Sequence, residues 1–169
     1  FTVANEEKTK KLIQAQKRHM HIGVPGHGIV IAVPIKSVGG GKTVAFLNGE
    51  TDNAAYTPSL NYAHELIVAV CSQGCTDMVM NAARAAGARG GTVLHGKGTG
   101  AKGAPKFYNI TIAQEKEMIL IVAATSQKAA IMQSILKKAG PDSKAGTILF
   151  SLPTTQVAGF ALLDNQDET

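Results

Sequence analysis

The order of apolar segments after His64 constrains the fold of this chain more than any other feature of its sequence. Residues 66–71 form a continuous apolar run of strand length, and residues 92–94 also suit a strand. Residues 118–124 are the strongest strand candidate, and residues 147–152 supply a last one. Segments with helical spacing follow the first and third of these strands. The predicted order is therefore strand, helix, strand, long loop, strand, helix, strand.

The two helices are predicted from their ends and from their apolar faces. Thr76 is expected to cap the first helix, which Gly87 stops, and Ser126 is expected to cap the second, which ends at Gly140. The apolar faces comprise Val79, Ala82, Ala83 and Ala86 in the first helix and Met132, Ile135, Leu136 and Ala139 in the second. Two strand–helix–strand units with right-handed crossovers place both helices on one face of a four-stranded antiparallel sheet. The predicted fold class is therefore α+β, with the ferredoxin-like split βαβ arrangement.

A glycine-rich stretch, residues 90–103, contains the most specialised residues of the chain. We expect a loop to open there directly after the strand at residues 92–94, because repeated glycines let backbone N–H groups converge on an anion. The predicted anion-binding residues of this stretch are Thr92, His95, Gly96, Lys97, Gly98, Thr99, Gly100 and Lys102. His95 could donate to phosphate or simply cap the strand. The alternative for the whole stretch is a mobile hairpin tip with a solvated basic surface.

Neither of the two common glycine motifs for phosphate fits this stretch. The P-loop pattern requires Gly-Lys-Ser/Thr followed by a helix, whereas Gly98-Thr99-Gly100 is followed by more glycine and by Pro105. The dinucleotide fingerprint also requires a helix after the glycines and an acidic residue about 20 positions later. The prediction of anion binding therefore depends only on the general capacity of glycine-rich loops to direct backbone N–H groups toward an anion.

The N-terminal part of the chain carries a partial copy of the C-terminal pattern when residue n is laid on residue n+119 without gaps. Matched pairs are Val3 with Val122, Gln14 with Gln133, Ile29 with Ile148, Pro34 with Pro153, Val38 with Val157 and Gly40 with Gly159. Coincidence between two ordinary helix–strand units is the alternative. We expect residues 1–40 to be a partial repeat (strand end, helix, strand) whose first half precedes Phe1. Residues 41–62 would then be a linker, residues 63–163 the complete domain and residues 164–169 a tail.

Composition indicates a globular protein. Hydrophobic residues make up 44% of the chain and charged residues only 17%, which excludes a disordered composition, and no apolar run approaches the roughly 18 residues of a membrane span. Cys71 and Cys75 are too few for a disulfide framework, so we expect a reducing cytoplasm as the location. The two cysteines are expected to pack as small apolar residues, with a redox role as the alternative.

The net charge of +5 and the pI near 9.3 raise RNA binding as a second class of function. RNA-binding sheets of this type stack bases on aromatic residues, and residues 92–94 and 118–124 contain none. An enzyme would require a nucleophile beside a base, a carboxylate pair or a metal cluster, and the five histidines show no ligand spacing on a helix. We therefore expect a non-enzymatic regulator. A ferredoxin-like module that binds metal or RNA is the alternative.

Three segments in this order resemble the nitrogen-regulatory P-II proteins and their P-II-like relatives. They are AARAAGARGGTVLHGKGTG at residues 82–100, QEKEMILIV at residues 114–122 and AGTILFSLPTTQVAG at residues 145–159. The resemblance covers residues 64–163 in full and residues 1–40 in part. It implies a homo-oligomer, a trimer in this family, that holds a nucleotide such as ATP, ADP or AMP between subunits. It also implies a flexible loop that reports this small-molecule effector to a regulated target protein. From the missing aromatic residues and the short apolar runs we expect no nucleic-acid partner and no membrane span.

On this chain the resemblance places the effector loop at residues 96–112, with Lys106, Phe107 and Tyr108 within it. It places the second loop of the cleft at residues 141–146, with Lys144 as a phosphate ligand beside Gly146. The effector loop is shorter than in the typical regulators. The Glu-Lys-Glu run at residues 115–117 stands where members of the family have a lysine that binds 2-oxoglutarate. The arginines near the C-terminus that usually bind phosphate in the family are absent from this sequence. Nucleotide binding is therefore expected ahead of 2-oxoglutarate sensing.

Overall fold

The computed structural model describes residues 2–24, 27–35, 59–98 and 114–159, together with the backbone of residues 106–107 and 110–111. The chain divides into two compact units. The sheet unit is Tyr62–Leu152, and the terminal unit combines Phe1–Asn61 with Pro153–Thr169. Across the described residues, no helix has both the length and the apolar character needed to cross a membrane.

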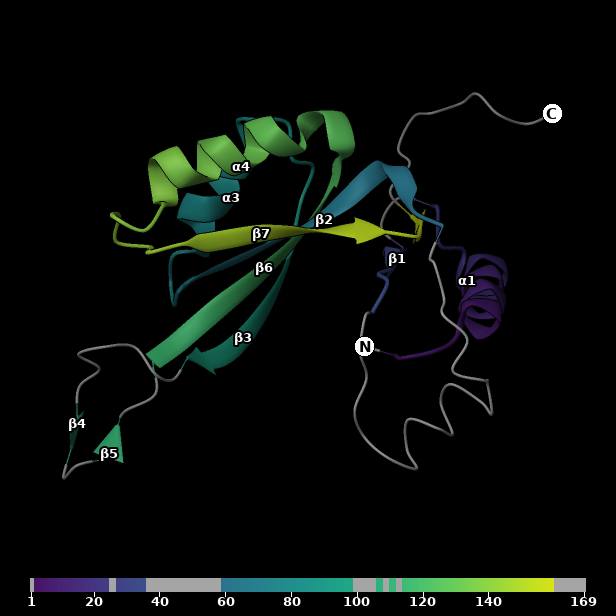
Figure 1. The fold of residues 1–169 in the computed structure, drawn as a ribbon, viewed down its shortest axis with the longest axis horizontal. Helices are drawn as coiled ribbons and strands as arrows, with labels where there is room; N and C mark the ends of the chain where they lie inside the picture. The colour runs from purple at the N-terminus through teal and green to yellow at the C-terminus, as the bar shows by residue number, and fades with distance from the viewer. Residues whose placement is uncertain are drawn as a thin grey trace. The chain divides into compact units, whose positions relative to one another are not determined.

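The sheet unit is built on a four-stranded sheet with strand order β3-β6-β2-β7 (Figure 1). Its strands are β2 (Asn61–Ser72), β3 (Thr92–Gly98), β6 (Gln114–Ala124) and β7 (Ile148–Thr154). Both neighbours of β6 run antiparallel to it. Two helices, α3 (Thr76–Arg84) and α4 (Thr125–Ala139), pack together on the sheet. The predicted α+β class and the four-stranded antiparallel sheet with its helices are confirmed.

The main core lies between the helices and one face of this sheet. Because side chains alternate along a strand, every second residue of β2 and β6 faces the helices. These residues are Ile67, Ala69 and Cys71 of β2 and Ile119, Ile121 and Ala123 of β6, all buried. On α4 the buried stripe is Ile131, Ile135 and Ala139, at a spacing of four residues. The prediction that Leu136 belongs to this stripe is wrong, since its position leaves it 47% exposed.

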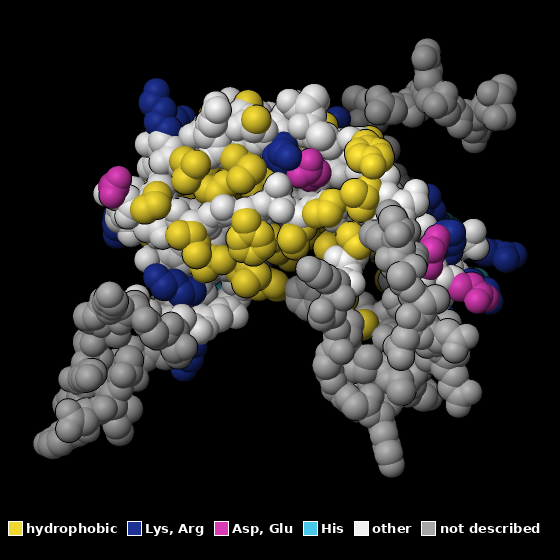
Figure 2. Space-filling model, viewed as in Figure 1, with side chains coloured by type: hydrophobic (Ala, Val, Ile, Leu, Met, Phe, Trp, Pro, Cys, Tyr) yellow, Lys and Arg dark blue, Asp and Glu magenta, His cyan; other side chains and the backbone are white. Residues whose placement is uncertain are grey.

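The opposite face of the sheet is apolar, and neither α3 nor α4 packs on it. Ile148 and Phe150 point away from Leu149, which packs into the core, and they are 61% and 47% exposed. Met118 of β6 and Tyr62 of β2 share this parity and are also exposed. Figure 2 shows hydrophobic side chains gathered over the strands of the sheet unit. We call these four residues the open sheet face.

The predicted caps of both helices are wrong by one or two positions. Cys75 is the N-cap of α3 and offers no side-chain hydrogen bond, while Thr76 is already the first helical residue. Helix α4 begins at Thr125, and its N-cap is Ala124. Helix α4 ends as expected, with Gly140 as its C-cap. Helix α3 ends earlier than predicted, at Arg84, so Ala86 lies after the helix and Gly87 adopts a φ of +99° in the turn that follows.

Strand β3 is longer than predicted and includes part of the glycine-rich stretch at residues 90–103. It runs to Gly98, so Gly96, Lys97 and Gly98 lie in a paired strand and not in a loop. Neither glycine has positive φ, because the ladder to β6 holds both in extended backbone. Two short strands, β4 (Lys106–Phe107) and β5 (Ile110–Thr111), pair with each other further along. Tyr108 and Ile112, which belong to the predicted effector loop, lie outside the described residues.

The terminal unit contains helix α1 (Glu6–Met20) and a two-stranded antiparallel sheet of β1 (Val30–Ala32) and β8 (Gln156–Ala158). Asn5 caps α1 by accepting the N–H of Lys8 at 2.9 Å. Ile13, Ile22 and Ala158 form a small core of their own. The strand end expected at the start of the chain is absent, because residues 2–5 have no regular structure. Of the expected linker at residues 41–62, residues 41–58 lie outside the described residues, as does the tail at residues 164–169, and residues 61–62 already belong to β2.

Candidate functional site at the base of the β3–β6 pair

Charged residues face one another where β3 and β6 lead into residues 99–113. The register pairs His95 with Glu117, Gly96 with Lys116, Lys97 with Glu115 and Gly98 with Gln114. The Lys97 Nζ lies 3.5 Å from Glu115 Oε1, and the His95 Nε2 lies 3.8 Å from Glu117 Oε1. The side chains of His95 and Lys97 are each 69% exposed. We call residues 95–98 of β3 and 114–117 of β6 the stalk of the predicted loop, and it presents the side chains of Lys97 and His95 to solvent.

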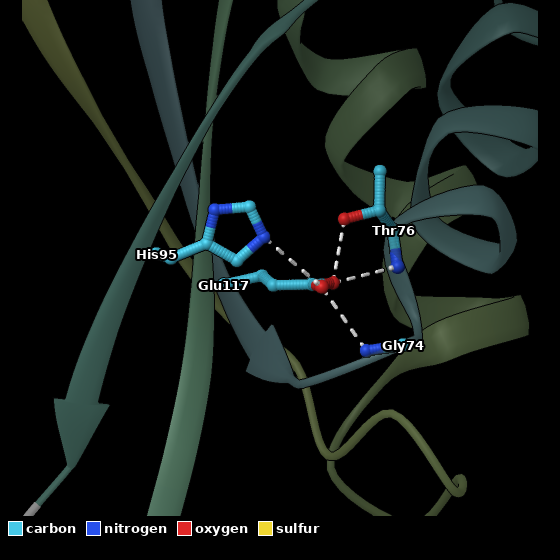
Figure 3. Close-up of polar contacts among 4 residues, drawn as sticks. All are labelled: Gly74, Thr76, His95 and Glu117. Atoms are coloured by element: carbon cyan, nitrogen blue, oxygen red, sulfur yellow. Dashed lines mark hydrogen bonds and ion pairs between the residues drawn. The ribbon is translucent and has the colours of Figure 1, made fainter.

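Glu117 differs from the other residues of this stalk because it is buried. It is 6% exposed and faces the helices, on the same side of β6 as Ile119. Its Oε1 accepts the N–H of Gly74 at 3.1 Å, and its Oε2 accepts the N–H of Thr76 at 3.1 Å and the hydroxyl of Thr76 at 2.6 Å (Figure 3). The pKa of Glu117 is lower than the usual value for a glutamate. The largest cause is the hydrogen bond from the Thr76 hydroxyl, and the two backbone donors and His95 add to it, whereas burial acts in the opposite direction and raises the pKa.

This carboxylate takes the place of a side-chain cap on α3. The N-cap residue Cys75 has no oxygen to offer the first turn, and Glu117 supplies one from across the sheet. A negative charge is stabilising at a helix N-terminus. The anion-binding capacity of this helix end is therefore already used by the protein's own carboxylate, and an external anion must be held by other groups.

The turn after α4 meets the end of β2 beside the stalk. Within this turn, Ser143 Oγ donates to Gly140 O at 2.7 Å and accepts from Ala145 N at 3.2 Å, while Gly146 has a φ of +53°. Ala145 O accepts the N–H of Ser72 at 2.9 Å. The ammonium of Lys116 donates to Ser72 Oγ at 3.3 Å. Ser72 therefore joins the turn that carries Lys144 to the charged part of β6.

The structure brings some of the predicted site residues together and leaves others undescribed. Thr92, His95, Gly96, Lys97 and Gly98 lie along β3, and Lys144 and Gly146 lie exposed on the turn after α4. Thr99, Gly100, Lys102 and Tyr108 lie outside the described residues, as do the side chains of Lys106 and Phe107. In the part of the chain that the structure describes, no group of three His, Cys, Asp or Glu residues could hold a metal ion.

Sequence reasoning missed Glu117 and its partners Gly74 and Thr76. A signal was present, because Glu117, Ile119, Ile121 and Ala123 alternate along β6 and the last three are plainly core residues. An acidic residue at an inward position of such a strand must find donors or a cation.

The two cysteines lie inside the protein and have the chemistry of core residues. Cys71 and Cys75 are 1% and 3% exposed, and both are free thiols. Burial, followed by the charge of Glu117 and the presence of Cys75, raises the pKa of Cys71 to about 11. The Cys71 thiol is therefore protonated at neutral pH, which is the inert state of a cysteine.

Comparisons with known proteins found one family and solved structures that this chain resembles. A family model described as "Nitrogen regulatory protein P-II" matches residues 64–160. Among solved structures, the crystal structure of Arabidopsis thaliana PII bound to citrate matches with 20% sequence identity and a TM-score of 0.43, over 54% of this chain and 77% of that chain. No curated protein matches.

Proposed function

The chain belongs to the nitrogen regulatory protein P-II family, whose members are non-enzymatic signalling regulators, and on this basis we propose that it senses an adenine nucleotide. The effector would be ATP, ADP or AMP, bound through its phosphates. The nucleotide-binding residues in this proposal are Thr92, His95, Gly96, Lys97, Gly98, Thr99, Gly100, Lys102, Lys144 and Gly146. A regulated target protein, an enzyme or a transporter, would read the bound state through the loop that contains Lys106, Phe107 and Tyr108.

The meeting of two basic elements at Ser72 is the observation that carries this proposal. Lys116 donates to Ser72, and the turn with Lys144 bonds to Ser72 through Ala145. Lys97 pairs with Glu115 one position along β6, so its side chain lies on the other face of the sheet from that of Lys116. The exposed Glu115 partly balances this charge through its 3.5 Å contact with Lys97. Each charged hydrogen bond to a phosphate contributes about 1.5–3 kcal/mol. If two lysines each make such a bond, removal of either one should measurably lower the affinity for a phosphate ligand.

The proposed mechanism couples this site to the loop through the two strands that carry it. A phosphate held by Lys97 fixes the last residues of β3, and the segment from Thr99 continues directly from them. The ligand shifts the loop between states only if it binds one loop state more tightly than the other. A target that recognises the ordered loop would then gain or lose affinity with nucleotide concentration.

We also propose that the protein is a homo-oligomer, as a trimer, assembled through the open sheet face. Tyr62, Met118, Ile148 and Phe150 are large apolar residues exposed on one face of one sheet. Large apolar residues exposed together on one face mark protein interaction sites. Closed symmetric assembly of identical chains is the commonest way to bury it. The effector cleft would lie between neighbouring subunits.

The domain organisation in this proposal keeps the boundaries expected from the sequence. Residues 63–163 would form the complete P-II-like domain, residues 1–40 a partial second copy, residues 41–62 a linker that overlaps the first two residues of β2, and residues 164–169 a tail. The family match at residues 64–160 supports the first of these assignments. The helix and strand at Glu6–Met20 and Val30–Ala32 support the second.

Calorimetric titration of the purified chain with ATP, ADP and AMP, with and without magnesium and 2-oxoglutarate, tests the proposed effector. We expect saturable binding of at least one nucleotide at fixed salt. Lys97→Ala and Lys144→Ala should each weaken it about tenfold, which corresponds to about 1.4 kcal/mol. The matched control is Lys138→Ala, which removes the same charge from the last turn of α4. Absence of binding, or equal affinity in all three variants, would reject the assigned site.

A further inference from the structure

We propose that His21 and His27 bind a transition-metal ion at the C-terminal end of α1. The two imidazoles would each supply one nitrogen ligand, and water would complete the coordination. Such a site has fewer protein ligands than the groups of three His, Cys, Asp or Glu residues that are absent from the described part of the chain. The proposed nucleotide site uses neither histidine, so this inference goes beyond the proposed function and is independent of it.

The rings of His21 and His27 lie at a separation that a shared metal ion allows. Their centroids are 6.2 Å apart, and the ring planes meet at 74°. A transition metal binds an imidazole nitrogen at about 2.0–2.1 Å, so two rings that share one ion have their centroids at most about 6.5 Å apart. Both residues are exposed, so small rotations of the side chains can adjust the angle between the two nitrogens at the metal. Binding therefore requires no rearrangement of the backbone.

A hydrogen bond of His27 determines which of its nitrogens is free. The His27 Nδ1 lies 3.3 Å from the carbonyl oxygen of Met20. Because a carbonyl oxygen can only accept, Nδ1 carries the proton and donates it, which leaves the lone pair of Nε2 available. Histidines that bind metals usually donate their other ring N–H to a carbonyl or a carboxylate, which orients the ring and raises its basicity. His27 therefore has the hydrogen bonding of a metal ligand.

The backbone between the two histidines forms an ordered turn. The N–H of Val24 donates to His21 O at 3.0 Å, and the N–H of His27 donates to Val24 O at 3.1 Å. Ile22, which directly follows His21, is 9% exposed and belongs to the small core of the terminal unit. The turn thus holds both imidazoles near each other before an ion binds, which lowers the entropic cost of binding.

The backbone conformation of His21 is unusual. It is the C-cap of α1, with φ 53° and ψ 37°, and among the described residues it alone has positive φ without being glycine. Glycine or asparagine usually occupies the left-handed position at a helix end. Residues other than glycine in sparsely populated backbone regions are found preferentially at functional and ligand-binding sites. A histidine here places an imidazole beside the last carbonyl groups of the helix.

The surrounding charges favour an ion that binds imidazole strongly. The partial negative charge at the C-terminus of a helix attracts a cation, but Lys17 and Arg18 in the last turn of α1 repel it. Binding must therefore come from the metal–nitrogen bonds, which favours Cu²⁺ over Ni²⁺ and Zn²⁺ and disfavours Mg²⁺ and Ca²⁺, which prefer oxygen. His19 precedes His21 by two residues, a spacing that does not place two side chains on the same side of a helix.

Calorimetric titration of the purified chain with Cu²⁺ tests the site, and pulsed electron paramagnetic resonance of the copper-loaded chain counts the imidazole ligands. We expect one strongly bound Cu²⁺ per chain, with two imidazole nitrogens. His21→Asn and His27→Asn should each remove one of these nitrogens. Each change should weaken binding at least about tenfold, since loss of even a supporting partner of a metal ligand typically costs that much. Asparagine tolerates the left-handed conformation at position 21, and circular dichroism verifies that both variants fold.

The matched control is His95→Asn, which removes an exposed imidazole from the sheet unit and should leave the affinity for Cu²⁺ unchanged. Equal affinity in all these variants would overturn the inference, as would a single imidazole nitrogen in the spectrum of the unmodified chain. The two variants at positions 21 and 27 should bind nucleotide as the unmodified chain does. A failure of nucleotide binding therefore rejects the proposed function and leaves the copper result readable.

Discussion

The hydroxyl of Thr76 donates a 2.6 Å hydrogen bond to Oε2 of Glu117, which lies 41 residues further along the chain. This bond ties the first turn of α3 to β6. The same carboxylate lies 3.8 Å from His95 on β3, the strand that leads into the predicted effector loop. One buried side chain therefore connects the helix layer, a central strand and the base of the loop.

Replacement of Glu117 by glutamine should destabilise the fold. The change removes the charge at the N-terminus of α3 and replaces one of the two acceptor oxygens by an NH2 group, so either the Gly74 N–H or the Thr76 N–H loses its acceptor. We therefore expect a loss of about 1–3 kcal/mol in the free energy of unfolding. Urea unfolding followed by circular dichroism measures it. The matched control is Glu115→Gln, whose carboxylate is 46% exposed and should cost about 0.5 kcal/mol or less. Equal losses in the two variants would contradict the capping role.

The stability of the wild-type protein should fall as pH drops below the ordinary range of a glutamate. The pKa of Glu117 is lower in the folded state, so between the folded and unfolded pKa values the unfolded chain binds more protons. Stability therefore rises with pH in this window and is lost as pH falls from about 4.5 through the folded pKa. Urea midpoints measured from pH 6 down to pH 3 should show a smaller decline in Glu117→Gln. Parallel curves would assign the acid sensitivity to other carboxylates.

The sheet could be predicted from the sequence because its strands are strongly patterned. Residues 118–124 are apolar without interruption, and the cores of β2 and β6 lie where such runs predict them. The error in β3 has a physical cause. Gly96 and Gly98 favour a loop by their own conformational freedom, but pairing with Lys116 and Gln114 of a long neighbouring strand extends β3 through both.

The capping site could not be predicted from local sequence because its members are far apart. Thr76 before a helical segment reads as an N-cap, and only the fold shows that Cys75 holds that position and that Glu117 replaces its missing oxygen. Lys116 and the turn that carries Lys144 likewise meet through Ser72 only after the sheet forms. Local sequence patterns therefore predict individual helices and strands. A site whose residues come from different strands can be recognised only once the tertiary structure is known.

Adjacent glycines before β3 should respond differently to alanine. A Cβ atom on Gly91 would lie 3.0 Å from Met80 Sδ, 3.1 Å from Ile119 Cγ2 and 3.2 Å from the carbonyl of Leu120, whereas one on Gly90 would meet nothing within 4 Å. We expect Gly91→Ala to lower the free energy of unfolding by about 1–3 kcal/mol through overpacking. Gly90→Ala should change it by about 0.5 kcal/mol or less. Urea unfolding of both variants distinguishes them, and similar values would contradict the close packing of Gly91.

The thiols should be unreactive until the protein unfolds. Cys71 and Cys75 are buried, and the pKa of Cys71 near 11 leaves almost no thiolate at neutral pH. We expect neither thiol to react with Ellman's reagent within minutes at pH 7.5 in the native protein. Both should react at once in 8 M urea. Rapid labelling of the native chain would show that the core around β2 opens readily.

Phe150→Glu should dissociate the proposed oligomer without unfolding the chain. The side chain is 47% exposed on the open sheet face, so a carboxylate there remains hydrated in a monomer but would be buried without a partner between subunits. Light scattering after size exclusion should show the wild type as a trimer and this variant as a monomer with native circular dichroism. Leu136→Glu is the matched control, because Leu136 is equally exposed at 47% but lies on α4, away from that face. This control should remain a trimer. A wild-type protein that is monomeric at micromolar concentration, or dissociation by both changes alike, would rule out the open sheet face as the subunit interface.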